Sequence, residues 1–229
     1  KKIKEISFKC YKSFAITLVE ILYLPFMSNR KIETVLKCKN IDFVRKKCNE
    51  KNGVILLSAH FGNWEYMAVS MGYQLKTAIA VVVKSQRNVY VTKWLNQVRG
   101  KWGNRVVPIG ISIRQIYSEL KNKNVVAMVA DQRGPKEGIR VNFFNKNTAV
   151  YSGPVLLSLK THAPILYGVA IRQPDYSYET EFIEISTENL PSENEAKITE
   201  LSRRHMLQLE KFIRKYPEQW LWMHKRWKY

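Results

Sequence analysis

Apolar and polar positions along this chain predict strands and helices in turn. Short apolar runs rich in β-branched residues predict strands at 54–57, 77–83, 106–109, 125–130 and 165–171. Helical spacing between them predicts helices at 64–71, 89–99, 111–120 and 155–160. This alternation favours an α/β fold with a mixed, largely parallel sheet and helices on both faces.

The two ends of the chain have a more helical pattern. An apolar stripe near the N-terminus predicts an amphipathic helix that ends before Pro25; it consists of Phe8, Tyr11, Ala15, Leu18 and Leu22. Further predictions are a helix at 41–48, an edge strand at 181–185, a loop at 186–195 and a long helix at 196–216. We therefore expect a single domain over 1–229, with an N-terminal helical part (1–52) and an α/β core (53–229).

The charge of the chain limits the classes of partner that it is expected to bind. Its 38 Lys and Arg against 19 Asp and Glu give a formal net charge of +19 over 229 residues. Such an excess predicts acidic partners, namely nucleic acid, an anionic membrane surface, or an acidic protein or substrate. The basic residues are scattered, and no helix-turn-helix, zinc or RNP signature is present. No nucleic-acid partner is therefore expected, although a basic nucleic-acid-binding protein stays the non-enzyme alternative.

Cysteine usage and hydropathy bear on cofactors and location. Cys10, Cys38 and Cys48 form no CxxC and no Cys/His spacing suited to zinc, so we expect reduced thiols and no metal. No uninterrupted apolar stretch approaches the ~20 residues that span a bilayer. We expect peripheral membrane attachment, with an N-terminal anchor absent from this chain as the alternative.

The chemistry is concentrated in Ser58-Ala59-His60-Phe61-Gly62-Asn63-Trp64-Glu65, directly after the first buried strand. His60 would stand at the carboxyl end of that strand, where ligands of open α/β sheets collect. Glu65 would lie in the first turn of the next helix, where the helix dipole stabilises a carboxylate. We expect His60 to act as general base and Glu65 to orient its imidazole. No G-x-S-x-G elbow occurs, so the pair would activate an external hydroxyl.

This octapeptide resembles the H-x4-D/E block of the lysophospholipid acyltransferase superfamily, and more closely the late acyltransferases of lipid A biosynthesis and their phosphatidylinositol mannoside relatives. The resemblance continues in four later segments: 83–85 with Asn88, 129–132, 148–164 and 217–227. The last, Pro-Glu-Gln-Trp-Leu-Trp-Met-His-Lys-Arg-Trp, is close to the terminal block of that family.

The resemblance implies a glycerolipid acyltransferase-like fold and transfer of a fatty-acyl group to a hydroxyl of a lipid A precursor or related glycolipid. The donor would be a thioester of acyl carrier protein or coenzyme A, and no cofactor is implied. The enzyme would work at the cytoplasmic face of a bacterial inner membrane. A lysophospholipid or other glycolipid acyltransferase is the alternative within enzymes.

Substrate-binding residues are expected around the same strand ends. The candidates are Asn63, Lys84, Arg87, Asp131 and Arg133. Lys84 stands where the family usually has Arg, and a lysine lacks the bidentate fork of a guanidinium, so Arg87 or Arg133 would share anion binding.

Two further expectations concern the oxyanion and the membrane. Stabilisation of an oxyanion would come from backbone amides near Gly62 or from cationic side chains, and the sequence leaves both open. Trp222 and Trp227, which lie among basic residues, are expected at a membrane surface together with the N-terminal helix.

Overall fold

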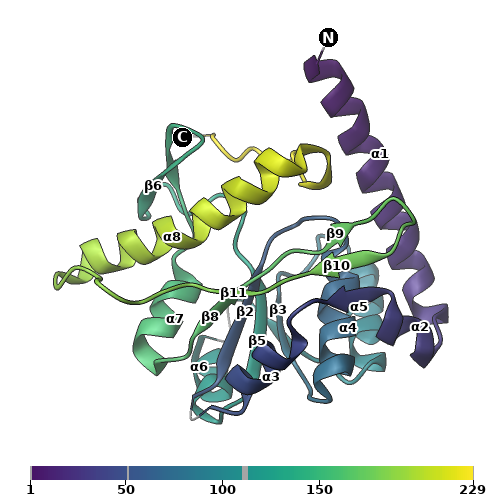
Figure 1. Cartoon of the computed structure of the whole chain (residues 1–229), viewed down its shortest axis with the longest axis horizontal. Coiled ribbons are helices and arrows are strands. Elements are labelled where there is room, and N and C mark those ends of the chain that lie inside the picture. Colours follow the sequence, from purple (N-terminus) through teal and green to yellow (C-terminus); the bar gives the residue numbers. More distant parts are fainter. Residues whose placement is uncertain (1, 51, 110–112, 229) are drawn as a thin grey trace.

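A central sheet with helices on both faces organises the molecule (Figure 1). The structure is a computed structural model and describes residues 2–50, 52–109 and 113–228. The predicted α/β class is confirmed.

The main sheet has the strand order β11-β8-β2-β5-β3-β4. Its members are β2 (Val54–Ser58), β3 (Ala80–Val83), β4 (Arg105–Pro108), β5 (Val125–Val129), β8 (Ile165–Tyr167) and β11 (Ile183–Glu184). Neighbours from β8 to β4 pair in parallel, and β11 joins β8 in antiparallel fashion at the edge. The carboxyl ends of the parallel strands therefore meet along one rim of the sheet.

Alternate residues of the strands supply two separate cores, because successive side chains of a strand point to opposite faces. In β2, Ile55 and Leu57 join one hydrophobic cluster, whereas Val54 and Leu56 join the other. Helices with buried residues in the first cluster are α6 (Ile113–Lys121), α7 (Gly153–Thr161) and α8 (Asn194–Lys215). Those in the second are α2 (Asn29–Thr34), α3 (Ile41–Cys48), α4 (Trp64–Leu75) and α5 (Val89–Lys101). The first two residues of the helix predicted at 111–120 lie outside the described residues.

The apolar run 165–171 is not one strand, as its pattern predicted, but two strands in different sheets. The chain leaves the main sheet after β8, and β9 (Ile171–Arg172) pairs with β10 (Tyr178–Thr180), which also pairs with β1 (Leu36–Cys38). Gly168 lies at the crossing, where a Cβ would come within 2.9 Å of the Phe182 ring. Sequence periodicity also missed the hairpin of β6 (Arg140–Phe143) and β7 (Lys146–Ala149).

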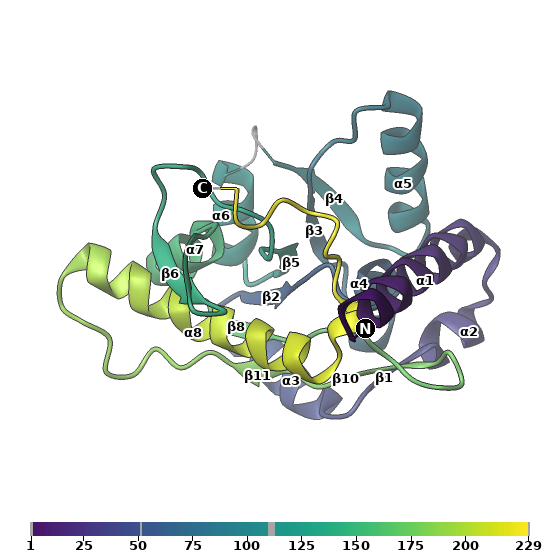
Figure 2. The same cartoon turned by 90° about the horizontal axis from the view of Figure 1, so that it is seen from above.

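The two ends of the chain meet beside this rim. Helix α1 (Lys2–Tyr23) continues into the short helix η1 (Leu24–Phe26) and contacts η2 (Pro217–Gln219), which follows α8. Figure 2 shows the segment after η2 turning back across the sheet. Phe61 and Trp220 form a β-bridge, and the Leu221 N–H donates to the His60 carbonyl over 2.9 Å. The C-terminal segment thus lies directly on the loop that carries His60.

Trp222 and Trp227, which were expected at a membrane surface, lie half-buried against the protein itself. Trp227 stacks on Phe143 with ring centroids 5.9 Å apart, and the Trp222 indole N–H donates to the Pro217 carbonyl. Neighbouring Arg226 is only 1% exposed and donates to the Ala149 carbonyl. These rings pack on an aromatic cluster of the protein itself because the segment folds back over β6.

Within the described residues, none of the helices combines the length and the apolar character needed to cross a membrane.

Candidate active site

His60 and Asp131 meet at the carboxyl rim of the sheet. Strands β2 and β5 are parallel neighbours with Ser58 opposite Val129, so residues two positions further on stand at the same height. His60 Nδ1 lies 2.7 Å from Asp131 Oδ1. A carboxylate only accepts hydrogen bonds, so Nδ1 carries the proton and Nε2 is left for a ligand.

The pair is stabilised electrostatically. Burial would lower the pKa of His60, but the charge and hydrogen bond of Asp131, with a contribution from Glu65, raise it above the ordinary 6.5. Burial would likewise raise the pKa of Asp131, but His60 and the indole N–H of Trp220 hold it below 3.8. Trp220 Nε1 donates to Asp131 Oδ2 over 2.9 Å, so each carboxylate oxygen has a partner. Asp131 therefore remains ionised and fixes both the tautomer and the orientation of His60.

Glu65 does not orient His60 in this arrangement, and the sequence expectation is corrected. The Glu65 carboxylate accepts two hydrogen bonds from Arg99, at 2.9 Å from Nε and 2.6 Å from Nη2. The Trp64 indole N–H donates to it as well, over 3.2 Å. A buried carboxylate needs a counter-ion, and a bidentate guanidinium on α5 provides one more completely than an imidazole can.

A large, mostly apolar cavity of about 1580 Å³ has His60 in its wall. Its walls come from α1, α4, α5, α6, α7 and the strand ends, with side chains such as Phe14, Met71, Trp94, Ile116 and Leu157. Glu65 and Arg99 also line it. The cavity therefore brings the His60 side chain, together with polar groups, to the wall of a large and mostly apolar space.

The expected substrate-binding residues are not all at this cavity. Lys84 and Arg133 line it, whereas Arg87 is exposed and is not among its lining residues. Asn63 is fully buried: its side-chain oxygen accepts from the Tyr66 N–H at the start of α4, and its amide nitrogen donates to Glu20. Both polar groups of Asn63 are engaged within the protein and tie the loop to α1 and α4.

Comparison with known proteins identifies the family. The sequence model of the bacterial lipid A biosynthesis acyltransferases matches residues 2–229. The chain belongs to this family.

Curated relatives share the same kind of reaction. The lipid A biosynthesis palmitoleoyltransferase of Escherichia coli K12 is 26% identical over 223 residues, which cover 95% of this chain and 70% of the relative. The lipid A biosynthesis lauroyltransferase of the same organism is 24% identical over 96% of this chain and 71% of its own length. A phosphatidylinositol mannoside acyltransferase of Mycobacterium tuberculosis is 24% identical over 64% of this chain and 48% of its own length. The protein is an acyltransferase.

Sequence reasoning missed two residues of the candidate site, Arg99 and Trp220. Arg99 belongs to no sequence motif and is one of many basic residues in the chain. Only the tertiary structure, which brings α5 beside α4, places it at Glu65. Trp220 lies in the terminal block, which the resemblance had already marked. Its contact with Asp131 depends on the fold of the C-terminal segment over the rim.

The three cysteines and the possible metal ligands bear on covalent and metal chemistry. Burial raises the pKa of Cys10, Cys38 and Cys48 to about 11, so none of these thiols is a ready thiolate nucleophile at neutral pH. No group of His, Cys, Asp and Glu suited to holding a metal ion occurs in the part of the chain that the structure describes.

Proposed function

We propose that this acyltransferase moves a fatty-acyl group from a thioester to a hydroxyl of a glycolipid, with His60 as general base and Asp131 as the residue that orients it. The observation that carries the proposal is the His60–Asp131 hydrogen bond, with His60 in the wall of the apolar cavity. Lipid A precursors are the acceptor class that we favour, because two of the relatives are named as acyltransferases of lipid A biosynthesis.

In the proposed reaction, His60 Nε2 accepts the proton of the acceptor hydroxyl while the hydroxyl oxygen attacks the carbonyl carbon of the thioester. The imidazolium that forms is stabilised by Asp131. Collapse of the tetrahedral intermediate breaks the carbon–sulfur bond, and the departing thiolate takes the proton from His60. The ester, the free thiol and neutral His60 result, so the cycle needs no other reactant.

The surroundings supply the remaining roles. The apolar cavity suits the acyl chain, because burying each methylene contributes about 0.8 kcal/mol. The Gly62 amide is engaged with the Gln219 carbonyl over 2.8 Å, which favours cationic side chains over this amide as oxyanion donors. Lys84 and Arg133 at the cavity wall are the candidates. Glu65 holds Arg99 in the wall of the same cavity.

The donor is proposed to be a thioester of an acidic carrier protein or of coenzyme A, because the chain carries a net charge of +19. The membrane surface of the protein would be the outer face of α1 with η1 and the start of α5. Large apolar side chains are exposed there, including Ile3 (80%), Phe26 (78%) and Tyr90 (81%). Leu18 and Val91 are both exposed on this face and part of the cavity lining, so the cavity adjoins it. Peripheral attachment to an anionic inner-membrane surface would thus bring lipid to His60.

The test compares the two carboxylates directly. Purified protein is supplied with acyl carrier protein or coenzyme A thioesters and with lipid A precursor, lysophospholipid or phosphatidylinositol mannoside, and products are weighed by mass spectrometry. His60→Ala should lose roughly 10²–10⁴-fold in rate. Asp131→Asn should lose almost as much, and Glu65→Gln considerably less. Exposed His162→Ala and Asp175→Asn are the matched controls.

The pH dependence adds a second test. The charge of Asp131 raises the pKa of His60, so Asp131→Asn should lower that pKa. Because the base must be neutral, the acidic limb of kcat/KM should move to lower pH in this variant. A full rate in Asp131→Asn, or a wild-type protein that acylates none of the acceptors, would refute the proposal.

A further inference from the structure

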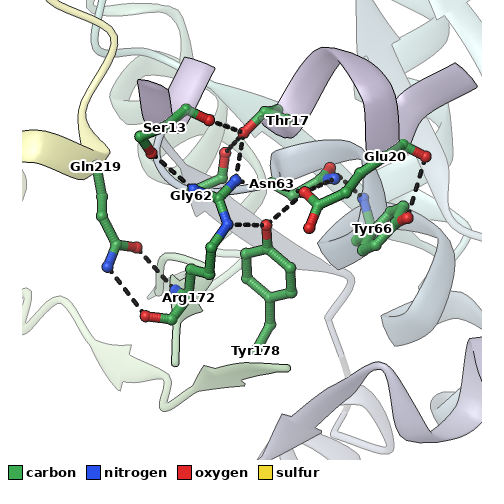
Figure 3. A network of polar contacts seen from close by, with 9 residues as sticks. All are labelled: Ser13, Thr17, Glu20, Gly62, Asn63, Tyr66, Arg172, Tyr178 and Gln219. Carbon is green, nitrogen blue, oxygen red and sulfur yellow. Dashed lines mark hydrogen bonds and ion pairs between the residues drawn. The ribbon is translucent and has the colours of Figure 1, made fainter. Parts of the chain in front are cut away.

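Helix α1 buries a polar face against the loop 60–63, which begins with His60. Ser13 and Thr17 are 9% and 1% exposed, and Glu20 is one turn further along the same face. Figure 3 shows these side chains directed toward the residues that follow His60 and toward Arg172. A surface helix ordinarily buries its apolar stripe, so a buried polar face needs a particular explanation.

The first contact of this face is with the backbone of Gly62. The Thr17 hydroxyl lies 2.9 Å from the Gly62 carbonyl oxygen, within donating distance. Gly62 has φ +53°, and a Cβ there would lie 1.9 Å from the Ala170 carbonyl oxygen, so glycine is required. Its N–H donates to the Gln219 carbonyl. Elements from both ends of the chain therefore hold one residue, Gly62, through the two peptide groups on either side of it.

Arg172 joins these elements. Its guanidinium donates to Ser13 Oγ (2.7 Å), Thr17 Oγ1 (2.6 Å) and the Tyr178 hydroxyl (2.6 Å). Its backbone is held by the Gln219 side chain, which accepts from the Arg172 N–H and donates to the Arg172 carbonyl. The side chain is only 8% exposed, so these hydrogen bonds form away from water, where leaving one unmade is costly.

Glu20 completes the connection to the start of α4. Its carboxylate accepts from the Tyr178 hydroxyl over 2.6 Å and from the Asn63 amide over 3.0 Å, and Arg172 lies 3.3 Å away. Asn63 in turn caps α4 through the Tyr66 N–H. The network thus forms hydrogen bonds with two consecutive residues of the loop, Gly62 and Asn63.

We infer that Thr17, Glu20, Arg172 and Tyr178 are positioning residues for His60. They fix the loop 60–63 at Gly62 and Asn63, so that His60 keeps its place between Asp131 and the cavity. This inference rests on the proposed function, because it gives the network a part in the same reaction. The outer face of α1 lines the cavity through Phe14 and Leu18, so a single helix contacts both the acyl space and the catalytic loop.

A merely structural network would lower the melting temperature of the protein without altering the site in the folded state. The variants are therefore mild, and those at Thr17, Tyr178 and Glu20 each have a matched control on an exposed residue of the same type. Thr17→Val is compared with Thr34→Val, because both hydroxyls lie near the carbonyl four residues earlier and only Thr17 reaches Gly62. Tyr178→Phe is compared with Tyr176→Phe, and Glu20→Gln with Glu33→Gln. Arg172→Lys is the conservative variant, which keeps the positive charge and loses the several N–H donors of the planar guanidinium.

Below the melting transition, the variants should lower kcat by about tenfold to a hundredfold with KM nearly unchanged, as expected for a misplaced catalytic group. The controls should match the wild type. Arg172→Lys should recover part of the rate that Arg172→Gln loses.

Two readouts do not need activity and separate this inference from the proposed reaction. Hydrogen exchange at Gly62 and at the first turn of α4 should accelerate in the variants, and the His60 pKa measured by NMR should move toward 6.5. The inference is overturned if folded variants keep wild-type exchange in the loop, wild-type His60 titration and wild-type kcat. If the exchange and titration change while the wild-type protein transfers no acyl group, the positioning stands and the proposed reaction fails.

Discussion

Helices α1 and α8 have the same length, 22 residues, and opposite ways of meeting the rest of the protein. Helix α8 buries apolar residues, with Leu201, Met206, Leu209 and Ile213 no more than 1% exposed. Helix α1 leaves large apolar residues outside, with Phe8 71% and Leu22 60% exposed, and buries Ser13 and Thr17. An amphipathic pattern therefore identifies two faces of a helix, but it does not say which face meets the protein.

The difference has an energetic meaning. Burial of apolar area holds α8 in place, and this hydrophobic interaction does not depend on the orientation of the groups involved. Hydrogen bonds and one ion pair, Arg172–Glu20, hold the buried face of α1 and require a defined geometry. We expect α8 to determine stability and α1 to determine the position of the loop and attachment to a membrane.

The largest effect is expected in the core face of α8. Leu209→Ala should lower the free energy of unfolding by about 2–5 kcal/mol, because it leaves a cavity in the core. Urea denaturation measures this change, with Leu207→Ala as control, since Leu207 is 42% exposed on the same helix. Equal losses in the two variants would contradict the comparison.

The next effect depends on pH. Burial, with the nearby charge of Arg226, lowers the pKa of His205 on α8 from 6.5 to about 4. The unfolded chain takes up this proton first as the pH falls, so stability is lost between about pH 6.5 and pH 4, by up to about 3 kcal/mol. His205→Leu should flatten this part of the stability profile measured by urea denaturation at several pH values. A profile as steep as that of the wild type would assign the acid sensitivity to other groups.

The outer face of α1 should affect membrane binding and not folding. Replacing Phe8 and Leu22 by Ser should weaken binding to phosphatidylglycerol vesicles about tenfold or more, since inserted apolar side chains contribute on the order of 1–2 kcal/mol each. The free energy of unfolding should change by less than about 0.5 kcal/mol. Vesicle co-sedimentation with a salt series measures the binding, and Leu207→Ser on α8 is the control. Unchanged binding of the double variant would exclude this face as the membrane surface.

The smallest effect is expected on the polar face of α8. Glu200 accepts hydrogen bonds from Arg203 and Arg204, which lower its pKa to about 2. Glu200→Gln should nevertheless cost less than about 1 kcal/mol of unfolding free energy, because the pairs are partly exposed and screened by solvent. Thermal unfolding of the wild type and of Glu200→Gln should respond almost equally to a change from low to high salt. A loss of unfolding free energy as large as that of Leu209→Ala would show that charges, not apolar burial, hold α8.

Local periodicity was sufficient for most elements and for the place of His60. The helix predicted at 41–48 has the same bounds in the structure, and the strands at 54–57 and 125–130 differ by single residues. These segments form where the pattern puts them because their propensity and burial agree. The break after β8 was missed because it depends on a sheet formed by segments far away in the sequence.

The sequence by itself determined the α/β class, the position of His60 at a strand end, and the amphipathic character of α1. Only the tertiary structure decided that Asp131, and not Glu65, meets His60, because β2 and β5 are neighbours although they are distant in the chain. It also decided that α1 turns its polar face inward, where Arg172 and Gly62 offer partners. Residue patterns act within a few residues, whereas the partner of a buried charge is set by which distant strands and helices pack beside it.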